Sequence, residues 1–257
     1  FKGISILMMP LTILLLIYTA SQGTLIDGAN ASRWLKIPLI GLSFQTSSLA
    51  IVVLMVYVAN YLSKIHIKKL KFKDSIIPLW TPVIFILLLI LPSNFSTVII
   101  IFISVILLAF LAGYPLKYLS IIITFSLIFL VFFILIAKSY PELIPNRIDT
   151  WISRIDNFSS STESGSESYQ VERAKIAIST GEIFGLGAGK SVMKNFLPQS
   201  SSDFIYAIIV EEYGLIGGAF VIILYLLLLF RILVVSYKAK SFFGKLITIS
   251  VGLPIII

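Results

Sequence analysis

Long apolar runs separated by short polar segments dominate the pattern of this chain. A helix needs about 20 consecutive apolar residues to cross a bilayer, whereas a barrel strand needs about half as many. We predict membrane-spanning helices near residues 4–20, 44–63, 76–91, 96–113, 116–137 and 204–236, and the start of another near 242. The pattern therefore predicts an all-α, polytopic transmembrane helix bundle.

Two of the apolar runs are longer than one crossing requires. Residues 95–137 contain Gly113-Tyr114-Pro115, and we expect a break there because proline ends a helix and glycine permits a turn. The run 204–236 has no such interruption. We therefore expect one long helix that tilts or extends beyond the lipid.

Composition narrows the class of protein further. Hydrophobic residues make up 58% of the chain and charged residues 12%, with a mean hydropathy of +1.03. A soluble domain is about half apolar and about a quarter charged, so soluble, disordered and fibrous classes are excluded. The absence of cysteine and a single histidine, His66, argue against a zinc site and a Ser-His-Asp triad. We expect a single membrane domain over 1–257 that is a fragment of a longer protein, because the chain opens without Met and stops inside an apolar run.

The net charge of +8 is concentrated in a few connectors. Lysines crowd the loop 64–74, and further cations lie at Lys2, Lys117 and 231–245. An alternating topology puts these segments on one face, and the positive-inside rule makes that face cytoplasmic. We interpret the lysines as orientation signals rather than as a nucleic-acid site. The long segment 138–203 then forms a large extracytoplasmic loop, with a flexible serine-rich middle at 159–168.

A glycine series near the end of this loop resembles part of a phosphate-binding loop. Gly185, Gly187 and Gly189 lead into Lys190-Ser191, but Phe184 occupies the position where the nucleotide motif needs glycine. Two interpretations stay open. The series forms a tight turn that requires glycine backbone angles, or its amides form a concavity for an anionic headgroup, with Lys190 beside it.

Three acidic residues follow where the loop meets the last long helix. Asp203 either caps that helix or, partly desolvated at the membrane surface, acts as a general base on a sugar hydroxyl. Glu211 and Glu212 lie about 12 Å further along the helix, where a carboxylate must face a basic partner or a cavity. A helical step of about 100° allows Glu211, but not Glu212, to line the same cavity as Asp203.

Cations also occur in the first extracytoplasmic loop. Arg33, Trp34 and Lys36 form either an interfacial anchor or a contact for a diphosphate, which a guanidinium can bind in a bidentate manner.

These segments together resemble the SEDS family, the polytopic peptidoglycan glycosyltransferases that include FtsW, RodA and SpoVE, and within it the division members most closely. The most specific stretch is 169–214. It contains Tyr169-Gln170, the glycine series, Leu197-Pro198, Asp203-Phe-Ile-Tyr-Ala and Glu211-Glu212-Tyr-Gly214 in family order. The loop Gly28 to Trp34, followed by Phe44-Gln45, matches the family's loop between its third and fourth helices.

The resemblance implies a concrete function. SEDS proteins polymerise lipid II, an undecaprenyl-diphosphate disaccharide-pentapeptide, on the outer face of the bacterial inner membrane during cell-wall synthesis. The family's essential aspartate falls on Asp203. Arg33, Lys36, Lys190 and Lys194 become candidate cations for the diphosphate, together with the glycine series and Ser191; Tyr169, Gln170, Glu211 and Glu212 become cavity or structural residues. No cofactor is implied except a divalent cation that assists the reaction.

The implied partners are a class B penicillin-binding protein transpeptidase, other divisome membrane proteins and the surrounding lipids. Two alternative functions stay open. A lipid II flippase needs a polar route through the bilayer, and the intramembrane charges here are sparse. A division scaffold without catalytic activity needs none of the acidic residues above.

Overall fold

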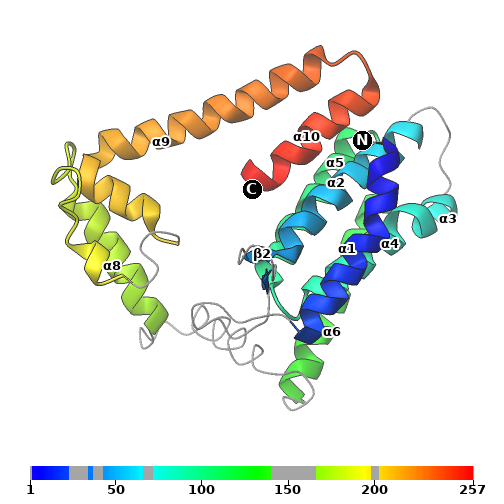
Figure 1. The fold of residues 1–257 in the computed structure, drawn as a ribbon, viewed down its shortest axis with the longest axis horizontal. Helices are drawn as coiled ribbons and strands as arrows, with labels where there is room; N and C mark the ends of the chain where they lie inside the picture. The colour runs from blue at the N-terminus through cyan, green and yellow to red at the C-terminus, as the bar shows by residue number, and fades with distance from the viewer. Residues whose placement is uncertain are drawn as a thin grey trace. The chain divides into compact units, whose positions relative to one another are not determined.

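The computed structural model describes residues 2–22, 34–36, 43–65, 72–139, 166–197 and 203–256. Within these ranges the chain is almost entirely helical, which confirms the predicted fold class (Figure 1). Among the described residues, five helices are long and apolar enough to cross a membrane: Gly3–Ser21, Thr46–Ile65, Phe72–Ile90, Leu116–Leu135 and Ile205–Lys238. The protein is therefore a multi-pass membrane protein.

The chain divides into two compact units. The first unit contains residues 1–151 and 232–257, and the second contains residues 152–231. The predicted boundaries of the spans agree with the helices to within a few residues. A single membrane domain over the whole chain stays a prediction.

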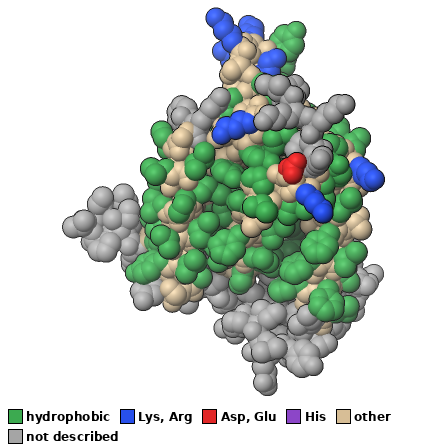
Figure 2. Space-filling view, turned by 90° about the vertical axis from the view of Figure 1, so that its right-hand side faces the viewer, with side chains coloured by type: hydrophobic (Ala, Val, Ile, Leu, Met, Phe, Trp, Pro, Cys, Tyr) green, Lys and Arg blue, Asp and Glu red, His purple; other side chains and the backbone are tan. Residues whose placement is uncertain are grey.

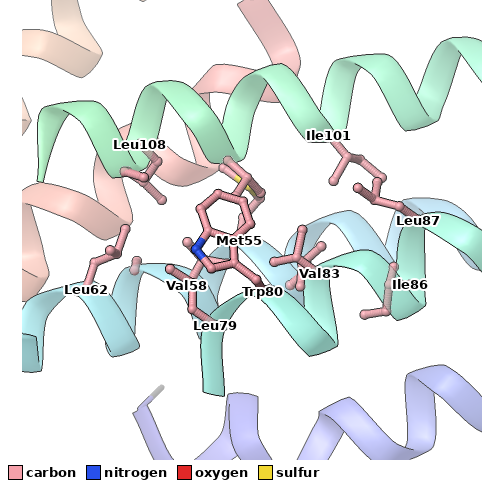
Figure 3. Close-up of a cluster of buried hydrophobic side chains, with 14 of the residues drawn as sticks. Met55, Val58, Leu62, Leu79, Trp80, Val83, Ile86, Leu87, Ile101 and Leu108 are labelled. Atoms are coloured by element: carbon pink, nitrogen blue, oxygen red, sulfur yellow. The ribbon is translucent and has the colours of Figure 1, made fainter. Parts of the chain in front are cut away.

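In the first unit, helices pack around a central one, α2 (Thr46–Ile65). It contacts the four helices α1 (Lys2–Gln22), α4 (Thr81–Ile90), α5 (Phe95–Leu111) and α10 (Phe242–Ile256). Met55, Val83 and Leu108 belong to one cluster of buried side chains from α2, α4 and α5 (Figure 3). Lipid tails are as apolar as these side chains, so close packing rather than exclusion from water holds such helices together.

The outer surface of the helices is apolar as well. Large side chains such as Leu7 and Leu14 on α1, and Phe125 and Phe132 on α6 (Leu116–Ser139), are more than half exposed. Figure 2 shows one face of the molecule on which hydrophobic side chains predominate and charged ones are few. This surface is suited to lipid contact.

The third predicted span is one apolar stretch with an irregular turn inside it. The short helix α3 (Phe72–Ser75) runs into a π-helical turn, η1 (Ile76–Trp80), and then into α4. Pro82 has no N–H to donate to the Pro78 carbonyl four residues earlier. That carbonyl instead accepts a hydrogen bond from the Tyr57 hydroxyl at 2.5 Å. Inside a membrane such pairing is required because no water is present to satisfy backbone groups.

The predicted break at 113–115 is confirmed. Helix α5 ends at Leu111, α6 begins at Leu116, and Gly113 between them adopts a φ of 81°. Tyr114 in this turn is buried, and its hydroxyl lies 2.5 Å from Ser75 Oγ and accepts the Trp80 indole N–H at 3.2 Å. The turn is thereby fixed against the start of the span Phe72–Ile90.

A small sheet was not predicted. Strand β1 (Trp34–Lys36) pairs with β2 (Ser43–Gln45) in antiparallel fashion, with Trp34 opposite Gln45. Strands of three residues are too short to show an alternating pattern in the sequence. The pairing joins the two pieces of the loop on which part of the family resemblance rested.

The second unit contains a helix inside the predicted extracytoplasmic loop. Helix α8 (Ser166–Thr180) is followed by a turn-rich segment, a 3-10 turn η3 (Met193–Asn195) and helix α9 (Ile205–Lys238). The predicted flexible stretch was therefore wrong for 166–168, which begin α8, while 159–165 lie outside the described residues.

Candidate functional site

Helix α9 is interrupted at Gly214, which has φ 70° and ψ −172°. In a regular helix, the N–H groups of Leu215 and Ile216 would donate to the carbonyls of Glu211 and Glu212. Instead, the turn at 182–187 inserts into this gap. Four backbone hydrogen bonds replace the two: Leu215 to Glu182 (2.9 Å), Ile216 to Ile183 (3.3 Å), Leu186 to Glu211 (2.9 Å) and Gly187 to Glu212 (2.9 Å).

The expected single helix over 204–236 is therefore corrected to two helical segments joined at a bend (Figure 1). An unpaired backbone group inside a protein is destabilising. The bend avoids this, because the two freed N–H groups and the two freed carbonyls of α9 all form hydrogen bonds with the inserted turn. The bend is thus built by the glycine series and α9 together.

Glycine is required at three points of this contact. A Cβ at Gly181 would overlap the carbonyl of Val210, one at Gly185 that of Glu212, and one at Gly214 that of Ile183. Gly185 and Gly187 also have φ values of 80° and 104°, which other residues rarely adopt. The structure thus favours the tight-turn interpretation of the series.

The alternative of an open amide concavity is corrected for four of the amides. The N–H groups of Gly185 and Lys190 donate to carbonyls within the turn, and those of Leu186 and Gly187 donate to α9. They are consequently not available to an anionic headgroup. Substrate binding by Gly185, Gly187 and Gly189 through other atoms stays a prediction.

Glu211 is completely buried in α9. Its carboxylate accepts three hydrogen bonds: from Ser191 Oγ at 2.5 Å, from the Val192 amide at 3.1 Å and from the Met193 amide at 3.2 Å. The predicted ion pair or open cavity is thus replaced by hydrogen-bond donors of the following loop. Hydrogen bonds to an ionised acceptor are the strong class, and they can offset part of the cost of burying the charge.

Ser191 links this carboxylate to the next turn. Its hydroxyl donates to Glu211 and accepts the amide of Lys194 at 3.1 Å, and the residue is 9% exposed. The predicted contact between Ser191 and substrate stays a prediction, although the hydroxyl faces the protein interior in the described chain. Sequence reasoning missed the pairing because it joins residues 20 positions apart.

The two lysines of this segment are exposed. The aliphatic part of Lys190 lies over Gly187: a Cβ placed on that glycine would be 3.4 Å from Lys190 Cδ and 3.8 Å from its Nζ. Lys194 belongs to η3, directly after the residues that Glu211 holds. Both ammonium groups are thus presented from a backbone that the buried carboxylate fixes.

Asp203 lies in the turn two residues before α9 begins, in the same compact unit as the lysines. It is exposed within the described residues, and the partial desolvation expected at the membrane surface stays a prediction. Its role as a general base stays a prediction.

The remaining candidates are Glu212, Arg33 and Lys36. Glu212 is half-buried, and its carbonyl is the group that pairs with the inserted turn. Arg33 lies outside the described residues, and only the backbone of Lys36 is described, in β1 of the first unit.

Helix α8 carries a cation that the sequence analysis did not single out. The guanidinium of Arg173 lies 4.7 Å from the ring centre of Tyr169 and 5.8 Å from that of Phe196. The first contact follows helical i, i+4 spacing, so the sequence did contain a signal for it. Tyr169 thus packs against Arg173 within α8, and Arg173 joins α8 to Phe196 after η3. Gln170 is half-buried.

Comparisons with known proteins point in one direction. The FTSW_RODA_SPOVE family model, described as "Cell cycle protein", matches residues 1–257. A "Probable peptidoglycan glycosyltransferase FtsW" of Marinomonas mediterranea is 31% identical over 243 residues, which is 92% of this chain and 55% of the relative. A protein of the same name from Hydrogenovibrio crunogenus is 31% identical over 250 residues, 95% of this chain and 61% of the relative. The chain thus spans little more than half the length of these relatives.

Solved structures share the fold. A structure described as "Structural coordination of polymerization and crosslinking by a peptidoglycan synthase complex" matches with a TM-score of 0.69 and 21% identity, covering 98% of this chain and 67% of the other. The rod shape determining protein RodA of Thermus thermophilus matches with a TM-score of 0.61 and 18% identity, covering 98% and 62%. At these identities the likeness establishes the fold alone.

Proposed function

Because the chain belongs to the FtsW/RodA/SpoVE family of cell cycle proteins, we propose that the whole protein is a peptidoglycan glycosyltransferase. It polymerises lipid II into glycan strands during cell division. The names of its relatives support this activity. The observation that carries the proposal is an exposed carboxylate, Asp203, in the same compact unit as the exposed lysines 190 and 194.

In the proposed reaction, Asp203 accepts the proton of the acceptor sugar's 4-hydroxyl. The hydroxyl oxygen attacks the anomeric carbon of the donor sugar, and the bond from that carbon to the lipid diphosphate breaks. The diphosphate leaves with the bonding electrons. General base catalysis by a positioned side chain contributes about 10²–10⁴-fold to such a step.

The negative charge that develops on the leaving diphosphate needs cations nearby. Lys190 and Lys194 are our candidates in the second unit, and Arg33 and Lys36 are candidates from the loop before α2. A divalent ion is a further proposal. However, no group of three or more His, Cys, Asp or Glu side chains comes together in the described ranges, so we route no step through a metal held by the protein.

The proposed location is the bacterial inner membrane, with residues 138–203 on the outer face, where the sugar of lipid II is found. The apolar helices and the lysine-rich connectors support this orientation. The proposed partner is a class B penicillin-binding protein, together with other membrane proteins of the division machinery. Its support is the likeness in fold to a peptidoglycan synthase complex.

The experiment is polymerisation of labelled lipid II by the full-length protein, with and without its transpeptidase partner. Asp203→Asn keeps the shape of the side chain and removes the base, so we expect polymer formation to fall by about 100-fold or more. Asp74→Asn, at an exposed carboxylate of α3 in the other unit, is the matched control and should leave the rate unchanged. A folded Asp203→Asn protein with normal polymer yield would remove Asp203 from the mechanism.

The same preparations separate the alternative functions. Lipid II movement across liposomes without polymer formation would identify a flippase. Normal cell division supported by Asp203→Asn would identify a scaffold.

A further inference from the structure

The buried carboxylate of Glu211 is not used by the chemistry proposed above. From its contacts we infer that Glu211 is a positioning residue, which holds the segment 190–194 so that Lys190 and Lys194 together bind the diphosphate of the lipid substrate. The inference rests on the proposed function for the identity of that substrate. It assigns to α9 a second task besides carrying the turn with Asp203.

Both carboxylate oxygens of Glu211 are hydrogen-bonded to the segment 190–194. One carboxylate oxygen accepts the Ser191 hydroxyl, and the other accepts the amides of Val192 and Met193. These donors are consecutive in the sequence, so a single side chain fixes three successive residues. Loss of the acceptor would leave buried donors without a partner, which costs more than the hydrogen bonds themselves contribute.

Lys190 and Lys194 lie on either side of the residues that Glu211 holds. Lys190 immediately precedes the held residues, and the Lys194 amide donates to the same Ser191 hydroxyl that donates to Glu211. Lys190 is therefore next in sequence to a residue that Glu211 holds, and Lys194 is connected to Glu211 through the Ser191 hydroxyl. Both lysines are exposed.

A fixed backbone lowers the free-energy cost of binding the diphosphate. Two cations on a flexible loop would have to be ordered when the diphosphate binds, and that ordering would weaken binding. A preorganised backbone removes this cost before the substrate arrives. Glu211 is well suited to this purpose, because the turn at 182–187 independently anchors the preceding residues on α9. The segment 190–194 is the continuation of an already fixed turn.

The test measures binding of undecaprenyl diphosphate and of undecaprenol, the same lipid without the diphosphate, to the full-length protein in nanodiscs. Glu211→Gln keeps the size of the side chain and one acceptor oxygen, but presents an NH₂ group to Ser191. We expect its affinity for undecaprenyl diphosphate to fall about fivefold or more, from the loss of a charge-assisted hydrogen bond. Affinity for undecaprenol should stay unchanged.

Two further variants make the result specific. Ser191→Ala should weaken diphosphate binding in the same direction. Glu211→Gln combined with Ser191→Ala should be no worse than Glu211→Gln alone, because the hydrogen bond that Ser191→Ala removes is one of those that Glu211→Gln already disrupts. Glu182→Gln is the matched control, since Glu182 is exposed and its carbonyl, not its carboxylate, accepts the hydrogen bond from α9. It should bind both lipids as the unmodified protein does. In lipid II turnover, the inference requires both a raised KM and a lowered kcat, because the lysines bind the diphosphate of the substrate and stabilise its charge as it leaves.

The outcomes separate this inference from the proposed function. If the unmodified protein binds undecaprenyl diphosphate more tightly than undecaprenol but makes no polymer, the proposed function fails and the binding arms still decide the role of Glu211. Equal binding of the two lipids by the unmodified protein overturns the inference, as does unchanged diphosphate affinity in folded Glu211→Gln. If that variant does not fold, unchanged affinity in Ser191→Ala overturns it alone.

Discussion

At the scale of single residues, Gly214 has a backbone conformation that restricts which side chains the position accepts. Its φ of 70° with ψ of −172° is essentially accessible to glycine only, and an added Cβ would meet the Ile183 carbonyl. We expect Gly214→Ala to lower the free energy of unfolding of the full-length protein in detergent by about 3 kcal/mol or more, from backbone strain and overlap combined.

Gly189→Ala separates the two causes. Gly189 has a φ of 76° but open space around its Cβ position, so its substitution should cost only about 1–2 kcal/mol of backbone strain. Equal losses in the two variants would show that contact with the inserted turn contributes nothing. Denaturant titration monitored by intrinsic fluorescence gives both values.

In the first unit, the buried hydroxyl of Tyr114 fixes the turn between α5 and α6. Tyr114→Phe would leave the buried Trp80 N–H without its acceptor and remove one of two hydrogen bonds of the Ser75 hydroxyl, which still donates to the Phe72 carbonyl. We therefore expect a loss of about 1–2 kcal/mol in the free energy of unfolding. Tyr118→Phe is the matched control, since Tyr118 contacts Phe72 and Tyr114 through its ring. An equal loss in the two variants, measured by the same titration, would contradict the role assigned to the Tyr114 hydroxyl.

Residue patterns predicted some of this and not the rest. Gly113 and Pro115 announced a break because both act on the local backbone, which a sequence records directly. The bond from Ser191 to Glu211 depends on how the loop folds back onto α9, and no local pattern encodes that. The sequence indicated that Glu211 needs a partner, but only the structure identified that partner as Ser191 and the amides that follow it.

At the scale of elements, α9 shows why a glycine inside an apolar run is ambiguous. Hydropathy predicted a single helix across 204–236 because the run is continuous in composition. Its interruption depends on a turn some 30 positions earlier that supplies substitute hydrogen bonds for the broken ladder. The apolar spans themselves were predictable, because length and hydrophobicity suffice to define them in a membrane protein.

The glycine series illustrates the reverse case. Its spacing invited a chemical interpretation, whereas Gly181 and Gly185 are explained by close contact with the backbone of α9. The chemistry proposed for this segment therefore passes to the side chains of Lys190 and Lys194, which its fold displays. The glycine turn, which resembles a binding loop, thus positions the segment that carries the two lysines.

At the scale of the whole molecule, the proposed function depends on which side of the membrane receives the loop 138–203. The orientation predicted from the lysine-rich connectors requires Asn195 to be extracytoplasmic and both Lys73 and Lys240 to be cytoplasmic. All three residues are exposed, and the 257 residues contain no cysteine, so single-cysteine variants can be read without background from this stretch. We expect a membrane-impermeant maleimide to label Asn195→Cys in intact spheroplasts, and to label Lys73→Cys and Lys240→Cys only after lysis. Labelling of Lys73→Cys in intact spheroplasts, with Asn195→Cys protected, would turn Asp203 toward the cytoplasm and leave it unable to reach a sugar on the outer face.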